Sequence, residues 1–194
     1  MLYKDYQNSR DAAWEILIRE KIKALPVKVS DICKHLGIKV KHYIPDDDND
    51  GYSTIIDDKP VAFISSLVSA PRQRFTCAHE LWHIISGDVG KYKLVNREPS
   101  PNDNPVEQRA NVFASRLLAP LIVLDKLNVQ SPEDIARFCD ISITAAKIRF
   151  ERLQLIRKRN EEFIKTRGYS CFGISPYERK VLRRFRKYIK ANKL

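Results

Sequence analysis

The sequence has few of the residues that hold together disulfide-rich or membrane-embedded proteins. Only four of its 194 residues are cysteines, and none forms a Cys-x-x-Cys pair. A chain of this length can bury a core without disulfides, so we expect reduced thiols. No apolar run approaches the length of a membrane span, and residues 1–8 lack the apolar core of a signal peptide. These absences predict a cytoplasmic protein with no membrane association.

Acidic residues are also in the minority. The chain has 24 Asp and Glu against 35 Lys and Arg, a formal net charge of +11. A surplus of this size looks like that of a nucleic-acid-binding protein until the charges are located along the chain. Residues 176–194 hold eight Lys or Arg and one Glu, a net +7, which leaves +4 for the rest. The body of the chain is therefore only mildly basic, and composition alone does not favour nucleic-acid binding.

Histidine is scarce as well, yet two of the four histidines stand four residues apart. His79 and His83 belong to a His-Glu-x-x-His motif within residues 74–86, which we predict to be helical. On a helix the two imidazoles lie about one turn apart and can converge on one metal ion. Glu80 lies beside them, where it can act as the base on an attacking water.

The alternative is a solvated helix that carries two incidental histidines. The neighbouring side chains argue against it because they leave no wide polar face for solvent: Phe75, Ala78, Leu81, Trp82, Ile84 and Ile85. Buried imidazoles need partners, so the motif favours metal binding. Cys77 is two positions before His79, which turns it to the far side of the helix, and we do not count it as a ligand.

A second helix is predicted from Pro105 to Pro120, after a long polar stretch. A catalytic zinc site needs three protein ligands and one open position, and the two histidines supply only two. We predict that Glu107, in the first turn of this helix, reaches back to the metal, and that Asn111 orients a ligand imidazole. The alternative makes Glu107 a charge that complements the helix dipole. Three other carboxylates remain candidates for the third ligand: Asp88, Glu98 and Asp103.

The segment before the motif is predicted to hold two helices followed by a small sheet. The pattern predicts helices over residues 11–25 and 31–36, and strands over residues 38–44, 52–56 and 61–64, the last two joined by a hairpin turn. If residues 61–64 form an edge strand near the metal helix, they could pair with an extended peptide. That pairing is a hypothesis about substrate binding.

The two motifs together resemble the ImmA/IrrE family of zinc metallopeptidases. The resemblance rests on His79-Glu80-Leu81-Trp82-His83 followed by Glu107-x-x-Ala110-Asn111-x-Phe113-Ala114-x-x-Leu117-Leu118-x-Pro120, and it covers residues 10–160. It implies one zinc ion held by His79, His83 and Glu107, with Glu80 as the catalytic base. The chain departs from the family at Trp82, which is often glycine there, and at Cys77, which is often aliphatic.

The same resemblance implies an α+β fold. We expect a zincin-like minimal metallopeptidase that is mostly helical, with a small sheet containing antiparallel strands next to the metal-binding helix. Residues 1–160 are expected to form the metallopeptidase domain. Residues 161–194 are expected to be a linker and a basic amphipathic helix, with a polar connection over residues 160–173.

Within that domain, residues 131–157 look like a helix-turn-helix segment. The start of its second helix, residues 143–146, offers little hydrogen bonding to base edges, so we favour a structural role over DNA reading. The basic C-terminal helix could dock on the body, contact an acidic partner or touch nucleic acid. Contact with DNA through this helix is not favoured.

By the resemblance, the expected activity is hydrolysis of a peptide bond in a specific protein substrate. The implied substrate is a helix-turn-helix repressor of a phage or mobile element, which would make the protein an antirepressor. Conceivable donors to the tetrahedral oxyanion are Tyr92, His42 and Arg116. Two other functions remain open: a DNA-binding or regulatory protein with a structural zinc and no proteolysis, and a partner in a toxin–antitoxin-like module.

Overall fold

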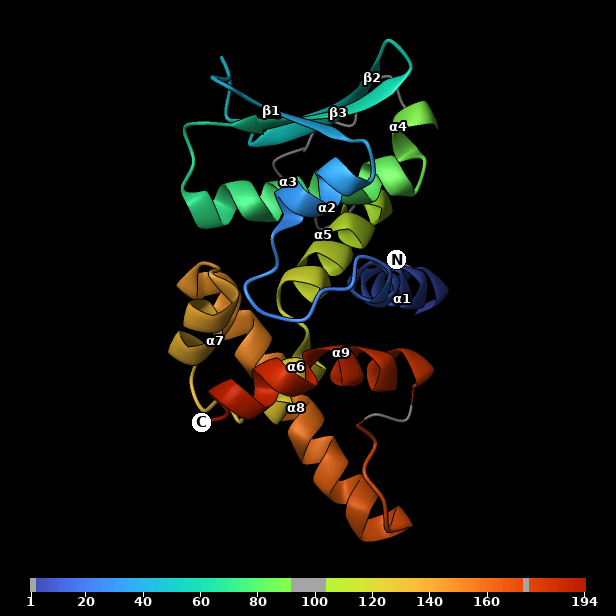
Figure 1. Cartoon of the computed structure of the whole chain (residues 1–194), viewed down its shortest axis with the longest axis vertical. Helices are drawn as coiled ribbons and strands as arrows, with labels where there is room; N and C mark the ends of the chain where they lie inside the picture. The colour runs from blue at the N-terminus through green and yellow to red at the C-terminus, as the bar shows by residue number, and fades with distance from the viewer. Residues whose placement is uncertain (1–2, 92–103, 173–174) are drawn as a thin grey trace. The chain divides into compact units, whose positions relative to one another are not determined.

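The computed structural model describes residues 3–91, 104–172 and 175–194, and its fold is α+β (Figure 1). These residues are mostly helical and include one three-stranded mixed sheet, as predicted. The chain divides into two compact units, residues 1–12 with 28–115 and residues 13–27 with 116–194. Within the described ranges, no helix is both long enough and apolar enough to cross a membrane.

The sheet belongs to the first unit and is built from β1 (Lys39–Tyr43), β2 (Gly51–Ile56) and β3 (Lys59–Ser65). β2 and β3 form the predicted hairpin and run antiparallel. Its two turn residues, Asp57 and Asp58, have φ angles of +48° and +58°. Such a pair is typical of the two-residue turn whose twist matches that of the flanking strands.

The order of the strands differs from the prediction. β3 lies in the middle of the sheet, between β1 and β2, so residues 61–64 are not an edge strand. β1 pairs with β3 in parallel, with Lys39 opposite Val61. The alternating pattern of residues 38–44 predicted a strand but carried no information about its partner. The edge strands of this sheet are β1 and β2.

Helix α3 (Ala70–Ile85) carries the His-Glu-x-x-His motif and packs against β2 and β3. Pro71 lies in its first turn, and every residue from Thr76 to His83 is buried. The contact with β2 is close at Gly51, where a Cβ atom would lie 2.6 Å from both Phe63 O and Thr76 Cγ2. Glycine at this position therefore lets the helix approach the sheet.

The two helices before the sheet differ from the prediction at their ends. α1 (Tyr3–Arg19) begins before residue 11 and stops before residue 25. Lys21 has a φ of +54°, which is incompatible with a continuing helix. α2 (Val29–His35) is followed by Gly37, whose φ of +72° fits the predicted residue just past a helix end.

Helix α5 (Pro105–Leu118) is the predicted second helix, and α4 (Asp88–Lys91) is a single turn after α3. The side chains that form the core of the first unit come from α2, β3, α3 and α5: Ile32, Ile64, Leu81, Ala110 and Phe113. The indole of Trp82 lies against the ring of Phe113, with the ring centroids 5.3 Å apart. The bulky indole of Trp82 is thus accommodated between α3 and α5.

The second unit contains α6 (Leu121–Lys126), α7 (Pro132–Cys139), α8 (Ile143–Arg167) and α9 (Pro176–Asn192). Its core is formed by Leu124, Leu127, Ile135, Leu153 and Phe185. Ser131 and Ser142 cap α7 and α8 through hydrogen bonds from backbone N–H groups. The helix-turn-helix-like pair is therefore present, with α7 packed against α8.

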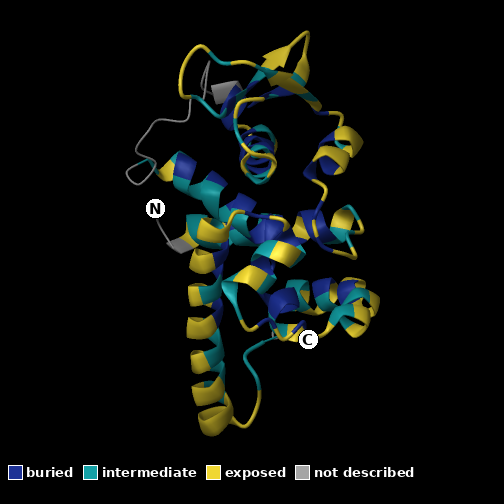
Figure 2. Cartoon of the chain, turned by 90° about the vertical axis from the view of Figure 1, so that its left-hand side faces the viewer, coloured by how far each residue is buried: buried dark blue, intermediate teal, exposed yellow. Residues whose placement is uncertain are grey.

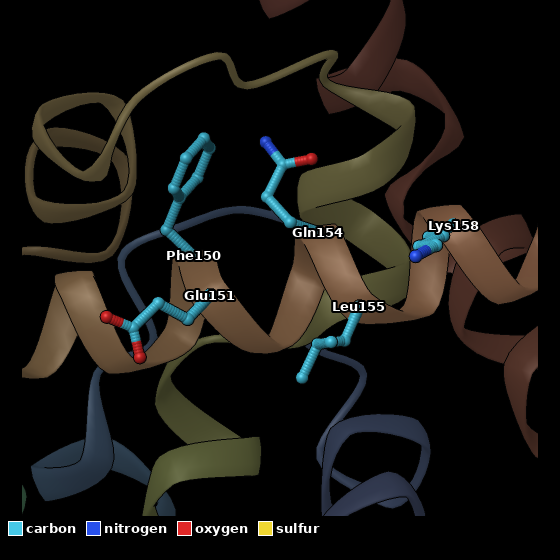
Figure 3. Close-up of a pocket in the computed structure, with 5 residues that line it drawn as sticks. All are labelled: Phe150, Glu151, Gln154, Leu155 and Lys158. Atoms are coloured by element: carbon cyan, nitrogen blue, oxygen red, sulfur yellow. The ribbon is translucent and has the colours of Figure 1, made fainter.

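Helix α8 is longer than predicted. It continues to Arg167, so the polar connection predicted from residue 160 is wrong over its first half. The later turns of α8 are largely exposed (Figure 2). A shallow hollow on this helix is lined by Phe150, Glu151, Gln154, Leu155 and Lys158 (Figure 3). None of these five residues was a candidate for the metal site. The predicted boundary between domains near residue 160 stays a prediction.

Candidate metal centre

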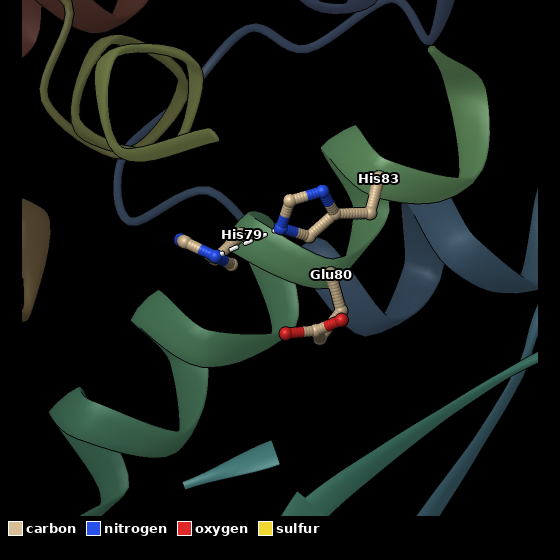
Figure 4. A group of neighbouring side chains, drawn as sticks. All are labelled: His79, Glu80 and His83. Carbon is tan, nitrogen blue, oxygen red and sulfur yellow. Dashed lines mark hydrogen bonds between the residues drawn. The ribbon is translucent and has the colours of Figure 1, made fainter. Parts of the chain in front are cut away.

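Three side chains from α3 and α5 bring their donor atoms together in the first unit. His79 Nε2 lies 3.0 Å from His83 Nε2 and 2.9 Å from Glu107 Oε2, while Glu107 Oε1 lies 3.3 Å from His83 Nε2. The two imidazoles face one another across one turn of α3 (Figure 4). All three side chains are 1% exposed. The residues that the sequence predicted as ligands are therefore neighbours in space.

The spacing and chemistry of these donors fit a metal ion. Tetrahedral coordination with bonds of about 2.0–2.1 Å would place the ligand atoms about 3.3 Å apart. Glu107 Oε1 is buried and forms no hydrogen bond with the described residues, although His83 Nε2 lies 3.3 Å from it. A buried carboxylate oxygen normally accepts a hydrogen bond, so this atom is available to a metal ion. His79 and His83, with Glu80 beside them, form a buried group that could hold a metal ion.

Helix α5 places Asn111 one turn beyond Glu107, on the same face. Asn111 Oδ1 lies 3.1 Å from His79 Nδ1, so it can accept a hydrogen bond from that ring nitrogen. This contact fixes the orientation of the ring and directs Nε2 toward Glu107 and His83. The part of Asn111 in orienting a metal ligand stays a prediction.

The imidazole of His83 has a carboxylate neighbour just beyond the C-terminal end of α3. Asp88 Oδ2 lies 3.5 Å from His83 Nδ1 and accepts a 2.7 Å hydrogen bond from Ser86 Oγ. The guanidinium of Arg109 lies 3.8 Å from the other carboxylate oxygen. Asp88 was a candidate for the third ligand, but it faces Nδ1 of His83 and not the nitrogen that faces Glu107. It is placed to orient the ring.

Glu80 lies beside the donors, with a carboxylate oxygen within 4.8 Å of an imidazole nitrogen of both His79 and His83 (Figure 4). Its side chain is buried, and Ser53 Oγ of β2 donates a 2.7 Å hydrogen bond to Glu80 Oε2. Burial raises the pKa of Glu80, and the nearby His79 and His83 and the bond from Ser53 only partly offset this effect. A carboxylate with a raised pKa is suited to accept and return a proton near neutral pH.

Without a metal ion, His83 forms an ion pair with Glu107. Burial lowers the pKa of His83, but the carboxylates of Asp88 and Glu107 outweigh burial and raise it to about 9. Burial raises the pKa of Glu107, yet its contacts with His79 and His83 prevail and lower it to about 2. The metal-free site therefore holds an imidazolium beside a carboxylate at neutral pH.

Three of the remaining candidates, Glu98, Asp103 and Tyr92, are outside the described residues. His42 is exposed on β1, and Arg116 is buried in the second unit. Cys77 Sγ lies 3.9 Å from Cys33 Sγ of α2, which agrees with its placement away from the imidazoles.

Sequence reasoning did not identify Ser53, and it did not assign Asp88 its position behind His83. The contact of Ser53 with Glu80 depends on the packing of β2 against α3, which no local pattern encodes. Asp88 follows His83 by five residues. The polar segment just after the helix was the signal in the sequence that could have indicated this contact. The glycine between His83 and Asp88, Gly87, has a φ of +76° and turns the chain back toward His83.

Comparison with known protein families bears on this site directly. A family model described as the IrrE N-terminal-like domain matches residues 33–151, which is more than half of the chain. The chain belongs to the ImmA/IrrE family. The matched region contains both helices of the metal centre, and this peptidase family together with the His-Glu-x-x-His group indicates a metalloprotease.

Comparison with solved structures shows a similarity in fold. A solved structure of a Mycobacterium tuberculosis transcriptional regulator is similar to this chain, with a TM-score of 0.53 and 14% sequence identity. The similarity covers 72% of this chain and 45% of that chain, so the chain spans less than half the length of the regulator. At this identity the likeness concerns the fold alone. No curated protein matches the chain.

Proposed function

We propose that the protein is a zinc-dependent endopeptidase that hydrolyses a peptide bond in a specific protein substrate. Two buried carboxylates at the site, Glu107 and Glu80, have different partners, and this difference supports the proposal. Glu107 converges with His79 and His83, while Glu80 stays beside them, bound to Ser53. Two imidazoles and one carboxylate are a donor set that zinc prefers in hydrolases, with a fourth position left for water.

A zinc ion held by His79, His83 and Glu107 would act as a Lewis acid toward the scissile carbonyl and lower the pKa of water at the site. Glu80 takes the proton of the attacking water and delivers it to the leaving amine. Its raised pKa suits both halves of this transfer. Ser53 holds the Glu80 carboxylate in one orientation during the reaction.

A purely structural zinc is the competing reading. Structural zinc sites are closed by four protein ligands. Among the described residues, three donors converge and the neighbouring carboxylate, Glu80, is engaged by Ser53. An additional buried carboxylate with a raised pKa suits proton transfer at such a site. This arrangement supports the peptidase over a regulatory protein with a structural metal.

The edge of the sheet offers a place for an extended substrate. β2 is an edge strand, and Ser53 on this strand contacts Glu80. A peptide that added to β2 through main-chain hydrogen bonds would run beside the base. We therefore propose β2, and not residues 61–64, as the strand that pairs with an extended peptide.

The expected substrate is a helix-turn-helix repressor of a phage or mobile element, cleaved in the cytoplasm by this antirepressor-type peptidase. The resemblance to the ImmA/IrrE family supports it, and the similar solved structure bears the name of a transcriptional regulator. The test is to incubate the zinc-loaded protein with a helix-turn-helix repressor from the same genome and to follow fragments by mass spectrometry. We expect discrete cleavage that a chelator abolishes and added zinc restores. An intact repressor under these conditions would contradict the proposed substrate.

A further inference from the structure

The charge of the chain divides unevenly between its two compact units. The first unit holds 13 Lys or Arg and 14 Asp or Glu, a net −1. The second holds 22 Lys or Arg and 10 Asp or Glu, a net +12. The unit that carries the metal centre is thus close to neutral, and the whole surplus lies in the other. Its sign and location point to a polyanionic partner of the second unit.

Helix α9 presents much of this charge on one face. Its apolar side is occupied, because Val181 and Phe185 are buried and the helix packs against α6. Its exposed positions are all Lys or Arg apart from Pro176 and Ala191. We define the α9 basic face by six of them: Lys180, Arg183, Arg184, Arg186, Lys187 and Lys190. None of the six forms an ion pair with the residues that the structure describes.

This face works against the stability of its own helix. The six cations form seven pairs that are three or four residues apart, and like charges at these spacings repel each other on a helix. A face that merely keeps a protein soluble interleaves both signs. α8 does so, because its exposed positions include Glu151, Glu161 and Glu162 among the cations. The self-repulsion of the α9 basic face is relieved when a polyanion binds.

We propose that the α9 basic face binds the phosphate backbone of duplex DNA without reading its sequence. The face spans residues 180–190, about 16 Å of helix, and duplex DNA carries one charge per roughly 1.7 Å of its axis. The exposed positions of α9 include no aromatic side chain on which single-stranded bases could stack. Its apolar residues face the protein, so it has no side to insert into a lipid surface.

The inference is independent of the peptidase. The cations lie in the second unit, and all the proposed ligands and the base lie in the first. A peptidase that holds DNA nonspecifically would raise its local concentration near DNA-bound proteins. DNA binding by the Glu80→Gln variant should equal that of the wild type, so failure of either proposal leaves the other intact.

The test is fluorescence anisotropy of a labelled ~20-base-pair duplex, titrated with the full chain at several NaCl concentrations. With four to six phosphate contacts, the slope of log Kobs against log salt should be about −3.6 to −5.4. The variant carries Arg183→Gln, Arg186→Gln, Lys187→Gln and Lys190→Gln. We expect it to bind ~10-fold or more weakly and to have a slope that is flatter by up to about 3.6.

The matched control removes the same charge from the first unit, at four exposed lysines: Lys28→Gln, Lys34→Gln, Lys39→Gln and Lys59→Gln. It should bind DNA as the wild type does. Circular dichroism should show that both variants are folded, and a double variant, Arg183→Gln with Lys187→Gln, serves if the quadruple one unfolds. Three outcomes overturn the proposal: no duplex binding at ~50 mM salt, equal weakening by the control, or preference for anionic phospholipid vesicles over DNA.

Discussion

Ser53 on the edge strand β2 donates a 2.7 Å hydrogen bond to Glu80 on the metal helix, and both side chains are buried. The bond ties the sheet to the residue that we propose as the base. It also opposes the effect of burial, because it lowers a pKa that burial raises. The position of β2 therefore affects both the orientation and the basicity of Glu80.

Substitution Ser53→Ala should affect the pH dependence of cleavage. Without the hydrogen bond the pKa of Glu80 rises further, so the acid limb of the pH–rate profile moves to higher pH. We expect kcat to fall about tenfold near neutral pH and zinc stoichiometry to stay at one. An unchanged acid limb would show that Ser53 does not act on the base. Ser65→Ala, another buried serine of the sheet, is the control.

Gly51→Ala should destabilise the protein through a steric conflict. The added Cβ would lie 2.6 Å from Phe63 O and Thr76 Cγ2, so β2 and α3 would have to separate. Overpacking of this kind costs about 1–3 kcal/mol in the free energy of unfolding. Gly37→Ala introduces strain at a positive φ but meets no atom within 4 Å. Urea denaturation should find the first variant less stable, and the reverse order would contradict the close approach.

Asp88 and Glu107 should respond differently to substitution. Asp88→Asn keeps the metal donors and weakens only the support of His83, so we expect one zinc per chain with a 10–100-fold lower affinity. Glu107→Ala removes a donor and should abolish stoichiometric binding at micromolar zinc. Atomic absorption and a competition titration measure both quantities. Unchanged zinc stoichiometry in Glu107→Ala would rule out the third ligand.

Metal affinity should increase with pH in the range where His83 loses its proton. Its pKa in the metal-free protein is about 9, and zinc needs the neutral imidazole. Binding at pH 7 therefore releases about one proton, and affinity should rise about tenfold per pH unit between pH 7 and 9. Calorimetry in buffers with different ionisation enthalpies counts the proton. Affinity that stays constant over this range would contradict the ion pair.

The same shift makes a prediction for stability without metal. Because the folded-state pKa of His83 lies above its ordinary value of 6.5, the protonated ring stabilises the metal-free fold fully below that pH. This contribution is lost as the pH rises through about 9. The melting temperature of the chelator-treated protein should therefore fall between pH 7 and 9.5, and a rise would carry the wrong sign.

The sequence was most informative where one element determines the geometry. The spacing of His79 and His83 sets their approach on any helix, and α3 confirms the helix. The placement of Glu107 required two helices to meet, and the family motif supplied that information. Ser53 and the position of β3 in the sheet depend on contacts between strands and helices far apart in the sequence. Tertiary packing determines these contacts, and hydrophobic periodicity carries no information about it.

The charge of the chain shows a related limit. Counting along the sequence placed +7 in the last 19 residues and left a mildly basic body. The structure groups residues 13–27 and 116–194 into one unit, and that unit carries the whole surplus. Charge becomes informative about partners once the residues that share a compact unit are known.

The central claim is that Glu80 performs the proton transfer and does not hold the metal. The most direct measurement is the Glu80→Gln variant, analysed in one preparation for zinc content and for cleavage of the repressor. The account predicts one zinc per chain, as in the wild type, with the cleavage rate lowered at least about 100-fold. Undiminished cleavage, or loss of the zinc together with the activity, would contradict it.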